Sequence, residues 1–247
     1  MSGARRRLRL LSGMKVEIWS DIACPWCYIG KTRFEKALSA YEHAGEVEVV
    51  WRSFELQPDA SRQSPGTTAT HLMDKYGRSH DEVLGMMERV SEVAASEGLE
   101  FHLERGVAAN TFDAHRLVHY GASVGKGEAV MRRLMRAYQS DGEDLSDHGT
   151  LARLAVEAGL DASGARDVLA GDAFSDAVRS DERRARSLGV DGVPFFVFDE
   201  VHGVSGAQPT EFFLSALRQL GPQVRPLTMH GSAAPVCDED GCEVPQG

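Results

Sequence analysis

Residues 21–30 read DIACPWCYIG, and the spacing of Cys24 and Cys27 in this stretch decides which fold and chemistry to expect. Two cysteines separated by two residues can bind a metal, form a structural disulfide or exchange a disulfide with another molecule. Pro25 favours a helix that begins at this residue, because the N–H group that proline lacks would have no partner in a first turn. The sequence therefore predicts Cys24 at the tip of a helix and Cys27 on its first turn.

The apolar residues after Cys27 have helical spacing. Phe34, Leu38 and Tyr41 continue the stripe that Cys27 begins, which predicts that Cys27 is buried and that Cys24 is the exposed thiol. The free N–H groups at a helix N-terminus favour the thiolate, which is the reactive form of cysteine. Residues three apart on a first turn can also close into a disulfide. We therefore expect Cys24 to attack a partner and Cys27 to resolve the mixed disulfide.

Strand patterns on both sides of this helix predict a βαβ unit. Residues 15–20 read KVEIWS, in which apolar and polar side chains alternate. Residues 46–56 read EVEVVWRSFEL, an apolar run typical of a strand that is buried on both faces. The first half of the fold is therefore strand, helix and strand, with the cysteines at the turn into the helix.

The sequence pattern changes from strand-like to helical after residue 58. Capped segments of helix length fill residues 67–187 and predict five or six helices without a convincing strand. The aromatic run at 195–198, a second run at 201–207 and the segment PTEFFLSALRQLG then predict a ββα unit. We expect an α/β protein with five parts: a leader (1–13), a first half (14–62), a helical insert (63–187), a second half (188–221) and a tail (222–247).

Composition excludes several classes of protein. The 247 residues are 42% hydrophobic and 26% charged, which is typical of a soluble globular protein, and the net charge of -10 disfavours nucleic acid and anionic membranes as partners. No run of about 18 apolar residues predicts a transmembrane helix. The leader MSGARRRLRLLSG lacks the apolar stretch of an export signal, so we expect a cytoplasmic protein. Four cysteines are too few for a disulfide framework, which leaves catalysis or metal binding.

The pattern resembles the DsbA-type branch of the thioredoxin superfamily. CPWC at the first helix, a helical insert and GVPFFV before the ββα unit carry this resemblance, and the FrnE-like oxidoreductases within the branch also have a C-terminal C-x-x-x-x-C. It implies a thioredoxin fold in which Pro194 is cis and faces the active-site disulfide. The backbone of Val193 would then pair with an extended substrate segment. Together with Pro25 and Trp26, these residues form the expected substrate-binding surface.

The resemblance also implies the activity and its partners. We expect a protein thiol–disulfide oxidoreductase that acts as a reductase or isomerase through Cys24 and Cys27. Its substrates would be proteins with thiols or disulfides, and a small dithiol or glutathione would serve as reductant. No cofactor and no metal are expected, and neither is a nucleic-acid or membrane partner.

A second cysteine pair lies in the tail. Cys237 and Cys242 enclose Asp238, Glu239 and Asp240, and these carboxylates disfavour a thiolate at either sulfur. Such a pair is better suited to closing into a disulfide than to starting an attack. Two hypotheses remain open: the tail relays electrons to the CPWC, or its disulfide only staples a loop.

Three other functions compete with disulfide exchange. All four cysteines could bind one zinc ion, but the pairs are more than 200 residues apart, against about 15 to 20 in common zinc ribbons. Relatives of the same fold are glutathione-dependent transferases or 2-hydroxychromene-2-carboxylate isomerases, which typically have a serine where Cys24 stands. The insert could also bind unfolded chains as a redox-regulated chaperone. In that case Met86, Met87, Met131 and Met135 would line an adaptable surface, although their helical spacing is more typical of core.

The segment NTFDAHR at residues 110–116 belongs to the family pattern. We interpret it as a helix start capped by Asn110 or Thr111, with His115 on a face of the helix.

Overall fold

The computed structural model describes residues 13–61, 66–221, 237–238 and 241–242. The first half contains β1 (Met14–Ser20), α1 (Pro25–Ser39), η1 (Ala44–Glu46) and β2 (Val47–Ser53). The helical part contains α2 (Thr68–Tyr76), α3 (His80–Ser96), η2 (Leu103–Arg105), α4 (Phe112–Ser123), α5 (Gly127–Arg136), the π-helical turn η3 (Ala137–Asp141), α6 (His148–Glu157), α7 (Ala162–Ala170) and α8 (Ser175–Ser187). The last part contains β3 (Phe195–Phe198), β4 (His202–Ser205), α9 (Thr210–Leu220), β5 (Cys237–Asp238) and β6 (Gly241–Cys242).

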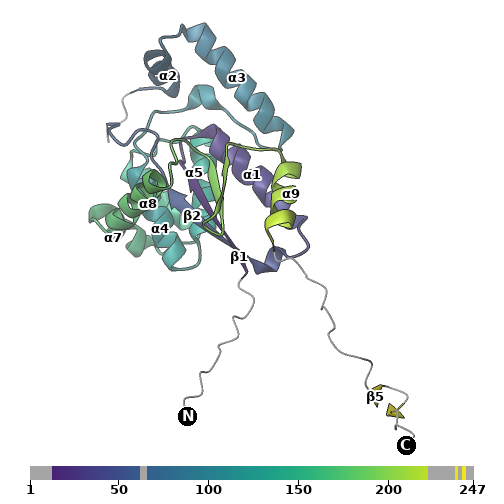
Figure 1. The fold of residues 1–247 in the computed structure, drawn as a ribbon. Helices are drawn as coiled ribbons and strands as arrows, with labels where there is room; N and C mark the ends of the chain where they lie inside the picture. The colour runs from purple at the N-terminus through teal and green to yellow at the C-terminus, as the bar shows by residue number, and fades with distance from the viewer. Residues whose placement is uncertain (1–12, 62–65, 222–236, 239–240, 243–247) are drawn as a thin grey trace, which may run out of the picture.

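A four-stranded sheet in the order β2-β1-β3-β4 forms the centre of the molecule (Figure 1). β1 is parallel to β2, and the antiparallel pairs β1–β3 and β3–β4 complete the sheet. The βαβ and ββα units are therefore joined through β1 and β3, as a thioredoxin fold requires. The predicted fold class is confirmed.

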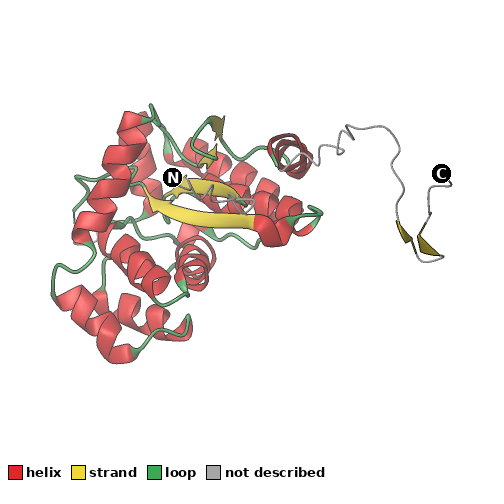
Figure 2. Ribbon diagram, turned by 60° about the horizontal axis from the view of Figure 1, so that its bottom comes forward, coloured by secondary structure: helices red, strands yellow, loops and turns green. Residues whose placement is uncertain are grey.

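The two faces of the sheet follow from the alternation along β1. Val16 and Ile18 pack with α1 and α9, whereas Trp19 packs with Ala185 of α8 on the opposite face. Figure 1 shows α1 and α9 on one side of the sheet and α8 on the other, and Figure 2 shows helices around the sheet from a second direction. Three phenylalanine rings join the first of these layers, from α1, β3 and α9, with centroids 4.5 to 5.6 Å apart: Phe34, Phe196 and Phe213.

Seven α-helices lie between β2 and β3 in the described part of the chain, not the predicted five or six. The difference arises at residues 162–187, where one long helix was expected and two are found. α7 ends at Gly171, and Phe174 adopts a left-handed backbone conformation (φ 64°) before α8 begins. Arg116 of α4 donates hydrogen bonds to the carbonyl oxygens of Val168 and Gly171, which the helix break leaves without helical partners.

The prediction that β2 is buried on both faces is wrong. β2 is an edge strand, and most of its side chains are only half-buried. The position at the edge of the sheet explains the difference, because an edge strand has a neighbouring strand on one side only. α8 packs on one face of the sheet. The side chain of Asp181 on this helix accepts a hydrogen bond from the amide of Ser53 at the end of β2.

The helices of the described residues include none with the length and apolar character that a membrane span requires.

Candidate active site around Cys24 and Cys27

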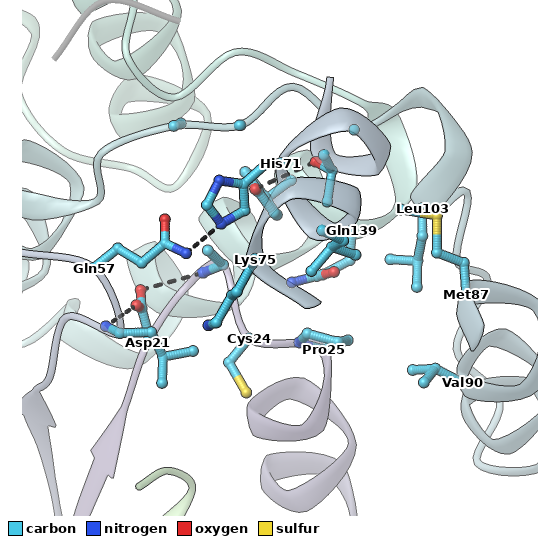
Figure 3. Close-up of a pocket in the computed structure, with 18 of the residues that line it drawn as sticks. Asp21, Cys24, Pro25, Gln57, His71, Lys75, Met87, Val90, Leu103 and Gln139 are labelled. Carbon is cyan, nitrogen blue, oxygen red and sulfur yellow. Dashed lines mark hydrogen bonds between the residues drawn. The ribbon is translucent and has the colours of Figure 1, made fainter. Parts of the chain in front are cut away.

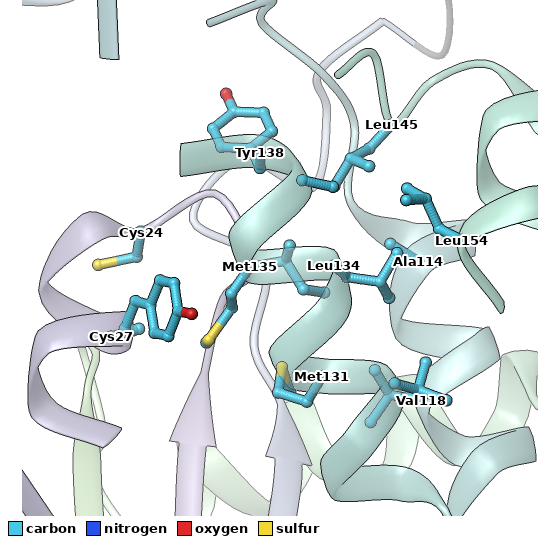
Figure 4. Packing of buried hydrophobic residues seen from close by; sticks show 14 of the residues in the cluster. Cys24, Cys27, Ala114, Val118, Met131, Leu134, Met135, Tyr138, Leu145 and Leu154 are labelled. Carbon is cyan, nitrogen blue, oxygen red and sulfur yellow. The ribbon is translucent and has the colours of Figure 1, made fainter. Parts of the chain in front are cut away.

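The two cysteines of the CPWC motif lie at the first turn of α1, as predicted. Cys24 is the N-cap residue, with an extended backbone, and Pro25 is the first helical residue. The amide of Cys24 donates to the carbonyl of Asp21 (3.2 Å), and the amide of Cys27 donates to the carbonyl of Cys24 (3.1 Å). Figure 4 shows both cysteines on this turn, at the margin of the apolar cluster formed with Met135 and Tyr138.

The topology of the sheet brings the Val193–Pro194 bond to Cys24. Because β3 is antiparallel to β1 and begins opposite Trp19, the residues just before β3 lie beside those just after β1. Sγ of Cys24 lies 3.8 Å from the carbonyl oxygen of Val193, which is 169 positions away in the sequence. The Val193–Pro194 peptide bond is cis, as the family resemblance implied.

Cys24 is less exposed than predicted. Only 5% of its surface is accessible, so the expectation of an exposed thiol is wrong. The physical reason is long-range, because Val193 and the helical part of the chain cover the tip of α1. Cys24 nevertheless lines a pocket that is open to solvent.

This pocket has a volume of about 310 Å³ and lies between the tip of α1 and the helical part of the chain. Its apolar wall comes from α3 and the η2 region, and its polar side comes from α2 and the turn after β2. Figure 3 shows Met87, Val90 and Leu103 on one side of the pocket, with Cys24 and Pro25 below its centre. The pocket combines apolar surface with a few polar groups, as ligand sites commonly do.

Cys27 lies one turn deeper than Cys24 and is almost fully buried, with 1% of its surface accessible. Burial raises the pKa of the Cys27 thiol well above its ordinary value, and the neighbouring Cys24 sulfur raises it further. The backbone of Asp21 and the hydroxyl of Ser20 oppose this shift by stabilising the thiolate. Cys27 is therefore protonated at neutral pH in the reduced protein and needs a proton acceptor before it can attack.

The remaining predicted site residues divide into two groups. Pro25 and Trp26 line the same pocket as Cys24, and Trp26 is 41% exposed at its rim. Cys237 and Cys242 are register partners in the antiparallel pair β5–β6. Their side chains lie outside the described residues.

The NTFDAHR segment forms the start of α4, as expected. Asn110 does cap the start of α4, since its side-chain oxygen accepts from the amide of Phe112 (3.0 Å). His115 is on α4, as expected, and the structure adds that its side chain is fully buried. Its Nε2 lies 3.5 Å from Oδ1 of Asp21, directly behind the CPWC turn. Arg116 is buried as well and holds the end of α7.

Several pocket residues were not identified from the sequence. Gln57 and His71 are hydrogen-bonded to each other across the polar side of the pocket, and Lys75 lies beside them (Figure 3). Gln139 donates to the carbonyl of Ile22 (3.1 Å) from the π-helical turn. No motif marked these residues, because the pocket is assembled from elements that are far apart in the chain. Of the four methionines considered for an adaptable surface, Met86 and Met87 line the pocket, and Met131 and Met135 are core.

Comparison with known proteins shows which family and which solved structures this chain is similar to. The family described as DSBA-like thioredoxin domain matches residues 15–218. The crystal structure of a probable DsbA oxidoreductase from Streptomyces coelicolor is 46% identical and superposes with a TM-score of 0.82, over 94% of this chain and all of that one.

Two more distant structures share the fold. The cytosolic disulfide reductase DsbM from Pseudomonas aeruginosa, in a complex with GSH, is 18% identical with a TM-score of 0.59, over 83% of this chain and 98% of that one. A 2-hydroxychromene-2-carboxylate isomerase is 16% identical with a TM-score of 0.64, over 83% of this chain and 95% of that one.

Proposed function

The chain belongs to the DSBA-like thioredoxin domain family, and from this premise we propose that it is a protein thiol–disulfide oxidoreductase that works through the CPWC dithiol. One observation supports the assignment above the others. Two free thiols share the first turn of one helix, the first bordering an open pocket beside Val193 and the second buried beneath it. A partner molecule in the pocket would therefore meet Cys24 and not Cys27, as the roles of an attacking and a resolving cysteine require.

Each thiol takes one step of the exchange. In the reductive direction Cys24 attacks a partner disulfide, and one partner sulfur leaves as a thiol while the other stays bound to Cys24. Cys27 then attacks Sγ of Cys24, which releases the second partner sulfur and leaves the Cys24–Cys27 disulfide. The partner gains two electrons and the CPWC loses two. Oxidation of a partner follows the same steps in reverse.

A protein partner fits the surface next to Cys24. The carbonyl of Val193 lies beside the Cys24 sulfur and is suited to pairing with the backbone of an extended segment. The adjoining pocket offers apolar side chains to the residues that flank the partner cysteine, and Trp26 extends this surface at the rim. Backbone pairing gives little sequence selectivity, so the pocket would supply it.

A small thiol such as glutathione is the proposed reductant. The pocket volume of about 310 Å³ lies at the lower end of the range for small-molecule sites, roughly 300 to 1,000 Å³. His71 and Lys75 line it and can face the carboxylates of such a thiol. The related fold of DsbM, which was crystallised with GSH, adds support. With a reductant of this kind, the cytoplasm is the proposed compartment.

The fold alone does not separate this function from isomerase or transferase chemistry, since an isomerase shares it. The thiol at Cys24 favours disulfide exchange, because the isomerases typically carry a serine at this position. Membership of the FrnE-like subgroup is part of the same proposal. So are Cys237 and Cys242, as an auxiliary pair that is either redox-active or structural.

Reduction of insulin with a small thiol as electron donor tests the proposal. We expect turnover by the wild-type protein and loss of at least about 99% of it in Cys24→Ser, because general exchange needs the attacking thiolate. Cys27→Ser should retain the attack and accumulate a mixed disulfide at Cys24, visible by mass spectrometry under non-reducing conditions. Equal insulin reduction by wild type and Cys24→Ser would refute the assignment.

A further inference from the structure

Lys75 on α2 is the only exposed charged side chain among the described residues that line the pocket next to Cys24. The other acidic or basic residues around this pocket are Asp21 and His71. Asp21 is buried, and its carboxylate accepts a hydrogen bond from the amide of Leu56 (2.7 Å). His71 is hydrogen-bonded across the polar side of the pocket. A ligand that enters the pocket therefore meets one free charge, and this charge is positive.

Lys75 has no ionic partner within the part of the chain that the structure describes. Its ammonium group lies 5.6 Å from the centre of the Tyr76 ring, which is a weak contact. The other lysines of the chain each donate a hydrogen bond or form an ion pair: Lys15, Lys31, Lys36 and Lys126. In a chain with a net charge of -10, carboxylates are abundant, yet none of the described ones pairs with Lys75. The charge of Lys75 is thus available to a carboxylate of a bound partner.

Apolar side chains surround this lysine in the pocket. Trp26, Leu56 and Tyr76 line the pocket and are exposed. Figure 3 shows the side chain of Lys75 extending toward the side of the pocket that Cys24 lines, with Met87 on the opposite wall. Apolar walls that exclude water strengthen an ion pair formed between them. The pocket therefore suits a partner side chain that combines an apolar stem with a carboxylate.

The course of the partner segment sets which of its side chains reaches Lys75. In the proposed mixed disulfide, the segment pairs with the backbone of Val193 and directs its cysteine at Cys24. Side chains alternate along an extended segment, so the residues next to the partner cysteine point away from the protein. The residues two positions from that cysteine return to the side of its sulfur, at a distance of about 7 Å along the segment. A side chain at one of these two positions enters the adjoining pocket.

We propose that Lys75 is a specificity-determining residue of the exchange reaction, which selects protein segments with an acidic side chain two positions from the reactive cysteine. The inference rests on the proposed function and names the class of its protein substrate. The bonds that form and break are those of the exchange steps above. A small acidic thiol also offers a carboxylate, so the experiment includes one as a separate arm.

Disulfides of short blocked peptides test the selection. Each peptide has one cysteine among alanines and carries glutamate or glutamine two positions before or after it. The second-order rate constant for oxidation of the reduced full-length protein is measured by acid quench, alkylation and mass spectrometry. All proteins carry Cys237→Ser and Cys242→Ser, so that only the CPWC reacts. The parent protein should prefer glutamate at one of the two positions by about fivefold at low salt, the upper range for an ion pair that stays partly exposed.

The ratio of the glutamate rate to the glutamine rate is the readout for each variant. Lys75→Gln should remove the preference, and Lys75→Glu should reverse it in favour of a peptide with lysine at the same position. Because the ratio compares two peptides on one protein, a general effect of Lys75 on the Cys24 thiolate cancels. Salt at about 0.5 M should weaken the preference of the parent protein, since it screens an exposed ion pair.

Lys36→Gln is the matched control, because Lys36 is an exposed lysine outside the pocket and pairs with Glu97. This variant should keep the ratio of the parent protein. Peptides with glutamate directly next to the cysteine control for the register, and they should show a smaller preference than those with glutamate two positions away. Thermal melts show that each variant is folded.

The inference is overturned if Lys75→Gln keeps the parent ratio, or if it slows both peptides by the same factor, which would place the effect on the thiolate and not on the partner. Oxidised glutathione and its neutral ester form the other arm. A Lys75 effect confined to this pair overturns the inference as well, because the selected carboxylate would then belong to the small thiol. A parent protein that none of the peptide disulfides oxidises, glutamine included, would instead refute the proposed function itself.

Discussion

Gly30 sets how closely α1 approaches the segment that carries Pro194. A Cβ atom at Gly30 would lie 3.0 Å from Cγ of Pro194 and 3.3 Å from Cα of Ala207. Neither neighbour is the free end of a flexible side chain, so neither can move aside alone. A glycine within a helix is otherwise unfavourable, and at this position close packing against the Val193–Pro194 segment explains it.

Gly30→Ala should therefore lower both stability and activity. The overpacking costs about 1 to 3 kcal/mol, which exceeds the gain of up to about 1 kcal/mol that alanine brings to a helix interior. We expect a net loss on the order of 1 kcal/mol in the free energy of unfolding, measured by urea denaturation. Insulin reduction should fall as well, since the Val193 carbonyl moves away from Cys24.

The control for this change is Gly85→Ala in the middle of α3. Only Nη1 of Arg89 comes near a Cβ atom there, at 3.6 Å. Without a clash the helix propensity dominates, so this variant should be more stable than wild type by about 0.5 to 1 kcal/mol. If Gly30→Ala were stabilised to the same degree, the close packing at Pro194 would be disproved.

At the scale of elements, the contact of α8 with β2 and the residues after it contains several charged side chains, although Asp181, Glu55 and Glu182 are buried. Asp181 accepts from Ser53 and pairs with Arg52, and Glu55 and Glu182 share Arg179. Among these contacts, the Asp181 carboxylate supplies a hydrogen-bond partner for one backbone amide of the edge strand, that of Ser53. Burial raises the pKa of Glu55, and the neighbouring Glu182 raises it further, although Arg179 opposes the shift.

The stability of this contact should depend on pH. The pKa of Glu55 rises from an ordinary 4.5 to about 7 in the folded state. Between these values the folded protein holds a proton that the unfolded chain has released, so folding stability falls as the pH rises through this window. The loss of stability is at most on the order of 3 kcal/mol, and it is complete only about one pH unit above the folded pKa.

Glu55→Gln should remove this dependence. Urea unfolding at about pH 5 and about pH 8 should show a smaller loss of stability in the variant than in wild type. Glu88→Gln, which removes an exposed carboxylate on α3, should lose as much stability between these two pH values as wild type does. An unchanged pH dependence in Glu55→Gln would show that Glu55 ionises normally.

At the scale of the whole molecule, Lys31 connects the thioredoxin half to the helical part. Its side chain is 1% exposed, and its Nζ pairs with Glu35 of the same helix and with Glu128 of α5 (2.8 Å). The ammonium group also lies 5.5 Å from the centre of the Trp51 ring on β2. One buried cation thus joins α1, α5 and β2, and Lys31 helps to lower the pKa of Glu128 against the effect of burial.

Lys31→Ala should reduce the free energy of unfolding by about 2 kcal/mol. This is less than the 3 to 5 kcal/mol typical of a broken buried ion pair, because Glu35 and Glu128 remain partly solvated. Lys36→Ala is the control, since Lys36 pairs with Glu97 at the surface and should contribute at most about 1 kcal/mol. Equal losses in both variants, measured by urea unfolding, would contradict a special role for the buried lysine.

The sequence by itself determined the features that local interactions specify. Pro25 fixes the start of α1, the alternation in β1 fixes its two faces, and the apolar stripe from Cys27 predicts its burial. Each of these depends on neighbours within about one or two turns or on a simple period. The order βαβ, helices, ββα followed from the same patterns, and with it the fold class.

Only the tertiary structure decided how distant segments meet. The antiparallel pairing of β1 and β3 brings Val193 to Cys24, Arg116 holds the break between α7 and α8, and His115 is buried behind Asp21. None of these contacts has a period in the sequence. They arise because separate elements must pack against one sheet, and the side chains that fill the space between them are selected by shape and charge rather than by their neighbours along the chain.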